Sequence, residues 1–386
     1  MAAAPVATEH PGSPEEAAEL LKTLGADGRA VRVRGGGTKS AWGASGAPVD
    51  LEIATDGLDR VLEHNEGDFT AVLEAGMPLA QARERFAATG QMFALDPPLG
   101  EGEAATVGGV LATADSGPLR HRYGGVRDLV VGITIALSDG SLAKAGGRVI
   151  KNVAGYDLGK LFAGSFGTLG LAVSVAMRLH PRPEETATAW GHSADAGALS
   201  NAAAALARLP LEADCLDVAW RDGAGQVLVR FGGAAAERQA IAVADRLRAA
   251  GLDDVQSTAD DAAMWSAQRD GQRSGEGAVL KVSGRPADLR TVLAAAREAD
   301  AQVVGRAALG LSWLRLEGED LAARAEAVRA TLAPRACTLQ DAPDAVRAAL
   351  APWAEPDPGA LAVMRRVKER FDPARIFNPG SFVGGI

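Results

Sequence analysis

Glycine clusters constrain the fold of this chain more than any other feature. Three consecutive glycines, Gly35 to Gly37, directly follow the short segment "AVRV", which predicts a buried strand that ends in bare backbone. Further clusters lie at Gly108-Gly109, Gly124-Gly125 and Gly164 to Gly170. Backbone N–H groups in such turns can converge on a pyrophosphate. We therefore predict a site for a long dinucleotide, with simple tight turns as the alternative.

Three familiar nucleotide motifs do not account for these turns. Walker A requires glycine immediately before Lys-Ser, where this chain has Thr38. A Rossmann GxGxxG in the same turn would require glycine at Ser40. The segment "GEGEAA" at Gly100 to Ala105 fits GxGxxA, but it follows a proline turn rather than a strand. The glycine turns therefore indicate a different kind of nucleotide-binding fold.

Length and composition bound the class of protein. A chain of 386 residues exceeds the roughly 250–300 residues at which a single core stops growing, which predicts at least two domains. The net charge of −9 argues against a general nucleic-acid binder, since phosphate contacts need clustered Lys and Arg. Cys215 and Cys337 form no CxxC or Cys/His arrangement, so we expect no iron–sulfur cluster or metal site within this chain.

The chain start and its apolar segments bear on location. "MAAAPVATEH" lacks a cationic region followed by an apolar stretch, so no signal peptide is predicted. No run of about 18 apolar residues occurs, so we expect no membrane span. The expectation is a cytoplasmic protein, with attachment to the inner face of the cell membrane through partners left open.

The order of predicted elements indicates an α+β fold. We expect a helix from Ser13, as N-cap, to a terminating Gly25, and hairpins over residues 60–76 and 130–145. Pro181 and Pro183 then predict a domain boundary near residue 185. Beyond it, alanine-rich helices alternate with short strands such as "CLDVAWRD" and "VLKVSG", an order typical of a ferredoxin-like domain.

Five segments together carry a family resemblance. They read "RGGGTK", "ATVGGVLATADSG", "RYGGVRDLVVG", "VIKNVAGYDLGKLFAGSFGTLGL" and the late "RVKERFDPARIFNPG". In this order they resemble the FAD-binding (PCMH-type) family of vanillyl-alcohol oxidase and D-lactate dehydrogenase, and within it the FAD-binding E subunits of bacterial glycolate oxidases. The resemblance covers the first 180 residues and returns at the C-terminus.

The resemblance implies a domain layout and a cofactor. It implies a two-lobed FAD-binding domain over residues 1–185, with a small lobe to about residue 95 and a large lobe over about 96–185. A ferredoxin-like cap over residues 186–335 would follow, and residues 336–386 would pack back onto the flavin domain. Relatives with covalent FAD have a His in the pyrophosphate loop, where this chain has Thr38 and Lys39, so non-covalent FAD is expected.

Fifteen residues receive cofactor-binding roles from the resemblance. The implied donors to the FAD pyrophosphate are Gly35, Gly36, Gly37 and Thr38. The implied lining of the diphosphate, ribityl and flavin edge is Thr106, Gly108, Gly109, Ala112, Thr113, Ser116 and Gly117. The implied neighbours of the adenosine part or the ring are Gly167, Thr168, Leu169 and Gly170. Many relatives have an acidic residue where this chain has Phe166.

No catalytic residue is assigned. All five histidines lie before residue 193, whereas self-sufficient hydroxy-acid dehydrogenases of this family have a His base or His metal ligands in the second half. Lys151, Tyr156 or a carboxylate could serve as base instead. Three arginines could clamp a carboxylate, or could serve only in solvation and ion pairing, namely Arg230, Arg306 and Arg315.

Three functions remain open at this stage. The first is an FAD subunit of a multi-subunit glycolate (2-hydroxy acid) oxidase, which acts with a second FAD subunit and passes electrons from glycolate or D-lactate to an iron–sulfur subunit. The second is a self-sufficient FAD-dependent hydroxy-acid or alditol oxidoreductase. The third is a non-catalytic subunit that FAD stabilises. The lack of histidine in the second half favours the first and third.

Overall fold

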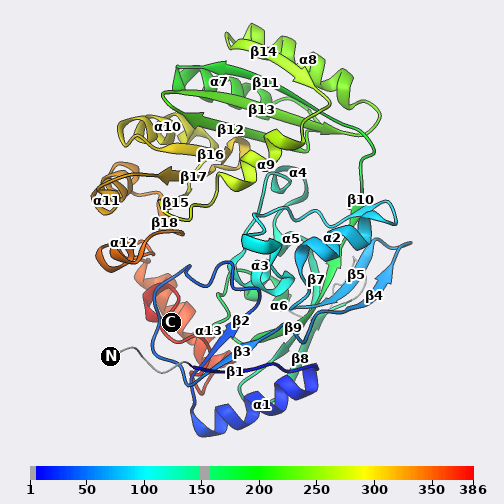
Figure 1. Cartoon of the computed structure of the whole chain (residues 1–386), viewed down its shortest axis with the longest axis vertical. Coiled ribbons are helices and arrows are strands. Elements are labelled where there is room, and N and C mark those ends of the chain that lie inside the picture. The colour runs from blue at the N-terminus through cyan, green and yellow to red at the C-terminus, as the bar shows by residue number, and fades with distance from the viewer. Residues whose placement is uncertain (1–5, 148–156) are drawn as a thin grey trace.

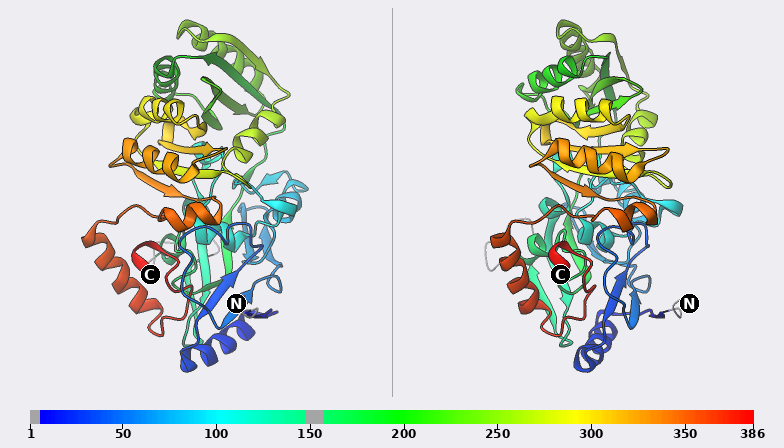
Figure 2. Two further views of the ribbon diagram at one scale, coloured as in Figure 1. Left: turned by 60° about the vertical axis from the view of Figure 1, so that its left-hand side comes forward. Right: turned by 90° about the vertical axis from the view of Figure 1, so that its left-hand side faces the viewer.

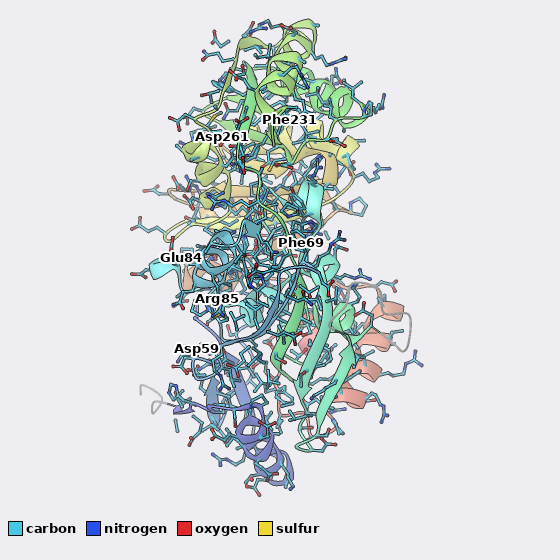
Figure 3. The ribbon with its side chains drawn as sticks, turned by 90° about the vertical axis from the view of Figure 1, so that its right-hand side faces the viewer. Asp59, Phe69, Glu84, Arg85, Phe231 and Asp261 are labelled. Carbon is cyan, nitrogen blue, oxygen red and sulfur yellow. The ribbon has the colours of Figure 1, made fainter. Side chains whose placement is uncertain are left out.

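The chain forms two parts (Figure 1). The lower part, called the flavin body, is the expected flavin domain together with the C-terminal segment, and the upper part, called the cap, begins at Thr186. The computed structural model describes residues 6–147 and 157–386. Figure 3 places Phe231 and Asp261 in the cap, with Phe69, Glu84 and Arg85 in the body beneath it. The expected α+β class with a two-lobed flavin domain is therefore confirmed.

The small lobe is a parallel three-stranded sheet with one helix. Its strand order is β1-β3-β2, with β1 (Ala7–Glu9), β3 (Leu51–Ala54), β2 (Val31–Arg34) and the helix α1 (Pro14–Asp27). The Ser13 hydroxyl accepts from the Glu16 N–H at 3.1 Å, and the Glu16 carboxylate accepts from the Gly12 N–H at 2.8 Å. The N-terminal capping box is thus confirmed.

The predicted end of this helix at Gly25 is wrong. The helix continues to Asp27, and Gly28 terminates it with φ of +65°. A Cβ atom at Gly25 would lie 1.9 Å from the Ser138 carbonyl oxygen. Gly25 therefore permits close packing of α1 against the hairpin loop at Ser138 instead of ending the helix.

The large lobe is built on an antiparallel five-stranded sheet in the order β4-β5-β9-β7-β8. Both predicted hairpins are present, as the pairs β4–β5 and β7–β8. The strands are β4 (Val61–Asn65), β5 (Thr70–Glu74), β7 (Val130–Ala136), β8 (Leu142–Gly146), β9 (Leu171–Arg178) and the outlying pair β6 (Gln91–Met92) and β10 (His180–Pro181). The helices are α2 (Leu79–Ala87), α3 (Val107–Thr113), α4 (Arg120–Tyr123), α5 (Val126–Leu129) and α6 (Leu158–Phe162).

The cap is one antiparallel eight-stranded sheet made of two ferredoxin-like units. Its order is β14-β11-β13-β12-β16-β17-β15-β18, so each half has a strand–helix–strand–strand–helix–strand path and the halves join where β12 pairs with β16. The first unit comprises β11 (Thr186–Ser193), α7 (Ala196–Ala207), β12 (Cys215–Arg221), β13 (Ala224–Gly232), α8 (Ala236–Ala249) and β14 (Asp253–Thr258). The second comprises β15 (Ala278–Ser283), α10 (Leu289–Glu298), β16 (Gln302–Arg306), β17 (Leu311–Leu316), α11 (Leu321–Leu332) and β18 (Ala336–Leu339).

The two faces of the cap sheet differ. Residues of one face form the main cap core with α7, α8, α10 and α11. On the opposite face, α9 (Ala262–Asp270) contributes Trp265 to a second cluster that also contains Leu119 of the flavin body. The cap sheet therefore turns this second face toward the flavin body.

The C-terminal segment returns to the flavin body. After α12 (Asp344–Ala349) and α13 (Pro358–Phe371), Phe377 forms a parallel bridge with Val31 of β2. The Lys368 ammonium is buried and donates to the Thr168 and Phe377 carbonyls at 2.7 and 2.9 Å. Figure 2 shows α13 on the outer side of the body, with the chain end beside the sheets. The expected return of this segment is confirmed.

Candidate cofactor site

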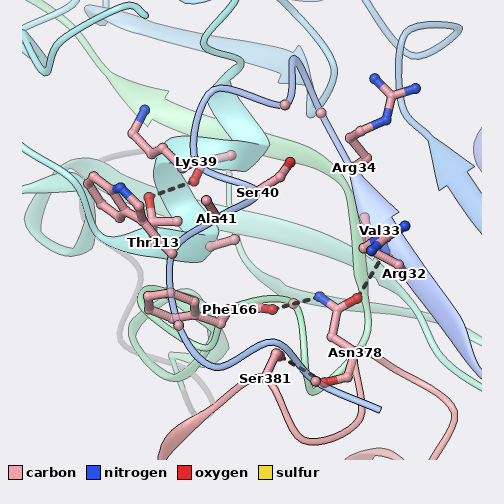
Figure 4. A pocket seen from close by; sticks show the side chains of 18 of the residues that line it. Arg32, Val33, Arg34, Lys39, Ser40, Ala41, Thr113, Phe166, Asn378 and Ser381 are labelled. Carbon is pink, nitrogen blue, oxygen red and sulfur yellow. Dashed lines mark hydrogen bonds between the residues drawn. The ribbon is translucent and has the colours of Figure 1, made fainter. Parts of the chain in front are cut away.

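A cavity of about 370 Å³ lies where the glycine loop, α3, the turn at residues 165–172, α12 and the C-terminal tail meet (Figure 4). Its volume falls in the range of small-molecule sites. Eleven of the fifteen implied cofactor residues line it: Gly35, Gly36, Gly37, Thr38, Thr106, Gly108, Gly109, Ala112, Thr113, Gly167 and Gly170.

The glycine loop presents free donors to this cavity. The N–H groups of Gly36, Gly37, Thr38 and Lys39 make no hydrogen bond to any residue within the described ranges. A Cβ atom at Gly36 would lie 1.6 Å from the Ala104 carbonyl oxygen. The bare backbone therefore lets the loop pack against its neighbour while consecutive amides stay available to an anion.

The cavity wall next to this loop begins at the N-terminus of α3, where a Cβ atom at Gly35 would lie 2.3 Å from the Thr106 hydroxyl. The Thr106 hydroxyl accepts from the Gly109 N–H at 3.2 Å, and the Gly108 N–H donates to the Ala75 carbonyl at 2.6 Å. A Cβ atom at Gly108 would lie 2.8 Å from that same carbonyl oxygen. These glycines thus shape the wall, and their N–H groups already have protein acceptors.

Four implied residues do not line the cavity. The Ser116 carbonyl accepts from the Gln272 side chain at 2.9 Å, and a Cβ atom at Gly117 would lie 1.8 Å from the Asp96 carbonyl oxygen. The Thr168 hydroxyl donates to the Ser165 carbonyl at 2.7 Å, and Leu169 is in the hydrophobic core. These residues hold the neighbouring segments in place. Lys151 and Tyr156, the alternative bases, lie outside the described residues.

The tail supplies cavity residues that the sequence did not predict. Asn378 accepts from the Val33 N–H at 2.9 Å and donates to the Phe166 carbonyl at 2.7 Å (Figure 4). One side chain thereby ties β2, which leads into the glycine loop, to the turn on the other side of the cavity. The Phe166 ring packs on Trp353 and Phe382, with centroids 5.0 and 5.5 Å apart. The only sequence signal was the turn motif "FNPG".

Residues of the cap and of the segment after it also contact the glycine loop. Arg273 donates to the Thr38 carbonyl at 2.8 Å and to the Asp341 carboxylate at 2.6 Å. The same carboxylate accepts from the Trp42 indole N–H at 2.7 Å. Lys39 lies 3.3 Å from the buried Asp115 carboxylate, and burial lowers the pKa of Lys39 while Asp115 opposes that change. The cofactor loop is thus clamped between both bodies.

The three arginines predicted as carboxylate clamps already have partners. Arg230 pairs with Asp261 at 3.0 Å, and Arg306 pairs with Asp217 at 2.9 Å. Arg315 donates to Gln302 at 2.7 Å. These contacts support the structural alternative for all three.

Lys281 on β15 is a cation that the sequence reasoning missed. Its ammonium makes no hydrogen bond or ion pair within the described part of the chain and lies 5.6 Å from the Trp313 ring centroid. Burial lowers the pKa of Lys281; Asp115 opposes this, and Arg120 adds to it. An ammonium without a hydrogen-bond or ion-pair partner in the described part of the chain is therefore within electrostatic reach of Asp115 in the flavin body.

Histidine does not contribute to the cavity. All five histidines lie in the described part, and none lines it. Among the described residues, no group of three or more His, Cys, Asp or Glu side chains is placed to hold a metal ion. No described helix is both long and apolar enough to span a bilayer.

Domain comparisons define the class of the protein as an FAD-binding one. Residues 5–146 match the "FAD binding domain" family, and residues 353–382 match "FAD linked oxidases, C-terminal domain". The free amides and glycine-shaped walls of the cavity fit such a cofactor. Two segments of the chain are thus similar to domains of FAD-linked oxidases, and FAD is the cofactor that these matches support.

Curated relatives align with part of the chain. An uncharacterized FAD-linked oxidoreductase of Mycobacterium tuberculosis is 34% identical over 50% of this chain and 41% of its own length. D-2-hydroxyglutarate dehydrogenase of Xanthomonas citri is 32% identical over 46% and 38%, respectively. Glycolate oxidase subunit GlcE of Escherichia coli is 38% identical over 32% and 35%. The chain thus covers less than half of the length of each of these relatives.

Solved structures share the fold over nearly the whole chain. Two structures of alkyldihydroxyacetonephosphate synthase superpose with a TM-score of 0.70 at 16% and 17% identity. They cover 96% of this chain and about three quarters of their own. At this identity the likeness shows the fold alone.

We expect the flavin to leave the protein intact on denaturation. Thr38 and Lys39 occupy the stretch where covalent relatives have histidine, and neither side chain is a usual flavin attachment site. Acid precipitation of the holoprotein should therefore release FAD into the supernatant, measured by its absorbance and chromatographic retention. Yellow colour that stays with the precipitate would contradict non-covalent binding.

Proposed function

We propose that this chain is the FAD-binding subunit of a multi-subunit 2-hydroxy-acid dehydrogenase. The observation that carries the proposal is that Lys281, which has no ion-pair partner among the described residues, interacts electrostatically with Asp115, the carboxylate that pairs with Lys39 of the cofactor loop. Lys281 and Arg120 would bind the substrate carboxylate there. The printed names of relatives, glycolate oxidase subunit and D-2-hydroxyglutarate dehydrogenase, support this substrate class.

The chain's own residues would bind and orient the substrate. When bound, FAD supplies an acceptor for the hydride of the alcohol carbon. Lys281 would fix the carboxylate on the cap side, and Trp313, which is fully buried, would exclude water from that side. The hydroxyl proton would need a base, and no histidine lines the cavity to take it.

Electrons would leave through other chains. Cys215 and Cys337 are free, buried and on different strands of the cap, so neither supports a cluster in this chain. The proposal therefore includes an iron–sulfur subunit and a second FAD subunit as electron carriers. The names of two relatives, each a glycolate oxidase subunit, support a multi-subunit complex.

Anaerobic titration tests the proposed function. Glycolate or D-lactate should reduce the flavin of the isolated chain slowly or not at all, because the cavity has no histidine base. The loss of flavin absorbance measures this reduction. Addition of a second flavoprotein subunit and an iron–sulfur subunit should start turnover. Rapid bleaching in the isolated chain would instead establish a self-sufficient oxidoreductase, and no turnover with any partner would favour the non-catalytic subunit.

A further inference from the structure

Among the described residues, four cations line the FAD cavity, and three of them have an ion-pair partner. Arg32 and Arg34 both pair with Glu52, at 3.1 and 2.5 Å. Lys39 pairs with Asp115 at 3.3 Å. The fourth is Arg347 on α12, which forms no ion pair with any residue in the described ranges. Of these four described cations, Arg347 is therefore the one without an ion-pair partner.

The contacts of Arg347 are all to neutral groups. Its Nε donates to the Ala342 carbonyl at 3.0 Å, and its Nη2 donates to the Gln340 carbonyl. Its Nη1 is buried with no hydrogen-bond partner. Leaving a buried guanidinium N–H unpaired is costly. This arrangement suits a side chain whose acceptor arrives with a ligand.

Arg347 lies on the same side of the cavity as the glycine loop. The Asp341 and Asp344 carboxylates both attract Arg347 without forming an ion pair with it, and Asp341 already accepts from the Trp42 indole N–H and from Arg273. Trp42 follows the loop closely in sequence, and Arg273 also holds the Thr38 carbonyl. Asp341 therefore places Arg347 beside the loop whose amides are free.

We propose that Arg347, from α12, binds the pyrophosphate of FAD beside the free amides of the glycine loop. The amides supply only partial charges, whereas a pyrophosphate carries two negative charges. A guanidinium can donate two parallel hydrogen bonds to phosphate oxygens. Because α12 connects the cap to the C-terminal segment, this contact also makes cofactor binding stabilise that connection. The inference depends on FAD as cofactor and not on the proposed substrate or partners.

Equilibrium binding to the flavin-free protein tests this assignment. FAD affinity is measured by flavin fluorescence quenching, and ADP affinity by competition, for the wild type, Arg347→Gln, Arg347→Lys and Arg329→Gln. Arg329→Gln is the matched control, since Arg329 also donates to backbone carbonyls, those of Ala351 and Pro352, but does not line the cavity. Far-UV circular dichroism of each variant establishes that it is folded.

Arg347→Gln should weaken both FAD and ADP binding at least about tenfold, the effect of one lost hydrogen bond to a charged group. The loss should shrink at high salt. Arg347→Lys should regain most of the affinity, because it keeps the positive charge. If Arg347 acted only through its contacts to residues 340 and 342, lysine would not restore the affinity. Arg329→Gln should stay within about threefold of wild type.

Three results would overturn the assignment. The first is FAD affinity of Arg347→Gln within twofold of wild type. The second is Arg347→Lys binding as weakly as Arg347→Gln, which would mean a structural role in α12. The third is weakened FAD binding with unchanged ADP binding, which would place Arg347 at the flavin ring.

Discussion

Lys368→Met should lower the free energy of unfolding by about 3–5 kcal/mol and release the C-terminal tail. The Lys368 ammonium donates to the Asp372 carboxylate at 2.7 Å and to the Thr168 and Phe377 carbonyls. Asp372 is fully buried, so removal of the lysine leaves an uncompensated charge in the interior. Urea denaturation followed by circular dichroism, with and without FAD, measures the effect.

The tail connects this stability to the cofactor. Asn378, Pro379 and Ser381 line the FAD cavity, and they follow Asp372 by only a few residues. A released tail would open the cavity, so Lys368→Met should also lose FAD on gel filtration. Adding Asp372→Asn should recover part of the stability, because the double variant buries no unpaired charge.

Lys22→Met is the matched control for this prediction. Lys22 is largely exposed, with a 3.6 Å pair to Glu19 in the same helix, and such pairs contribute little. The control should change stability by less than about 0.5 kcal/mol. Lys368→Met with the stability and FAD content of the control would show that the buried pair does not hold the tail.

Local sequence signals predicted the local parts of the fold. The capping box at Ser13 and Glu16 lies within four residues, and the turn of the β7–β8 hairpin lies at Asp139-Gly140. Such features depend on groups that are neighbours in sequence. The error at Gly25 has a tertiary cause, since the contact that requires this glycine is with Ser138.

The cofactor cavity depends on contacts that no local pattern encodes. Asn378 and Val33 are 345 positions apart, and Arg273 reaches Thr38 across 235 positions. The glycine loop could be predicted because its chemistry lies in one short segment. Arg347 and Lys281 could not, because what distinguishes each is the absence of a carboxylate partner among the described residues, which only the packing of two bodies reveals.

Gly36→Ala should abolish tight FAD binding. In this loop the added Cβ would lie 1.6 Å from the Ala104 carbonyl oxygen, far inside any real contact, so the loop must move away from its neighbour. The free N–H groups of residues 36–39 would then no longer point together at a pyrophosphate. Loss of two such hydrogen bonds to an anion should raise the FAD dissociation constant by about 100-fold or more.

The matched control is Gly275→Ala, since a Cβ atom at Gly275 would meet nothing within 4 Å. Both variants are compared by FAD fluorescence titration and by thermal unfolding of the flavin-free protein. Overpacking at Gly36 should also cost about 1–3 kcal/mol of stability, whereas the control should match wild type in both measurements. Because the loop can relieve the clash by moving, FAD affinity should be lost even where the loss of stability is at the lower end of this range. Gly36→Ala with full FAD occupancy and unchanged melting would mean that the three glycines only make a turn.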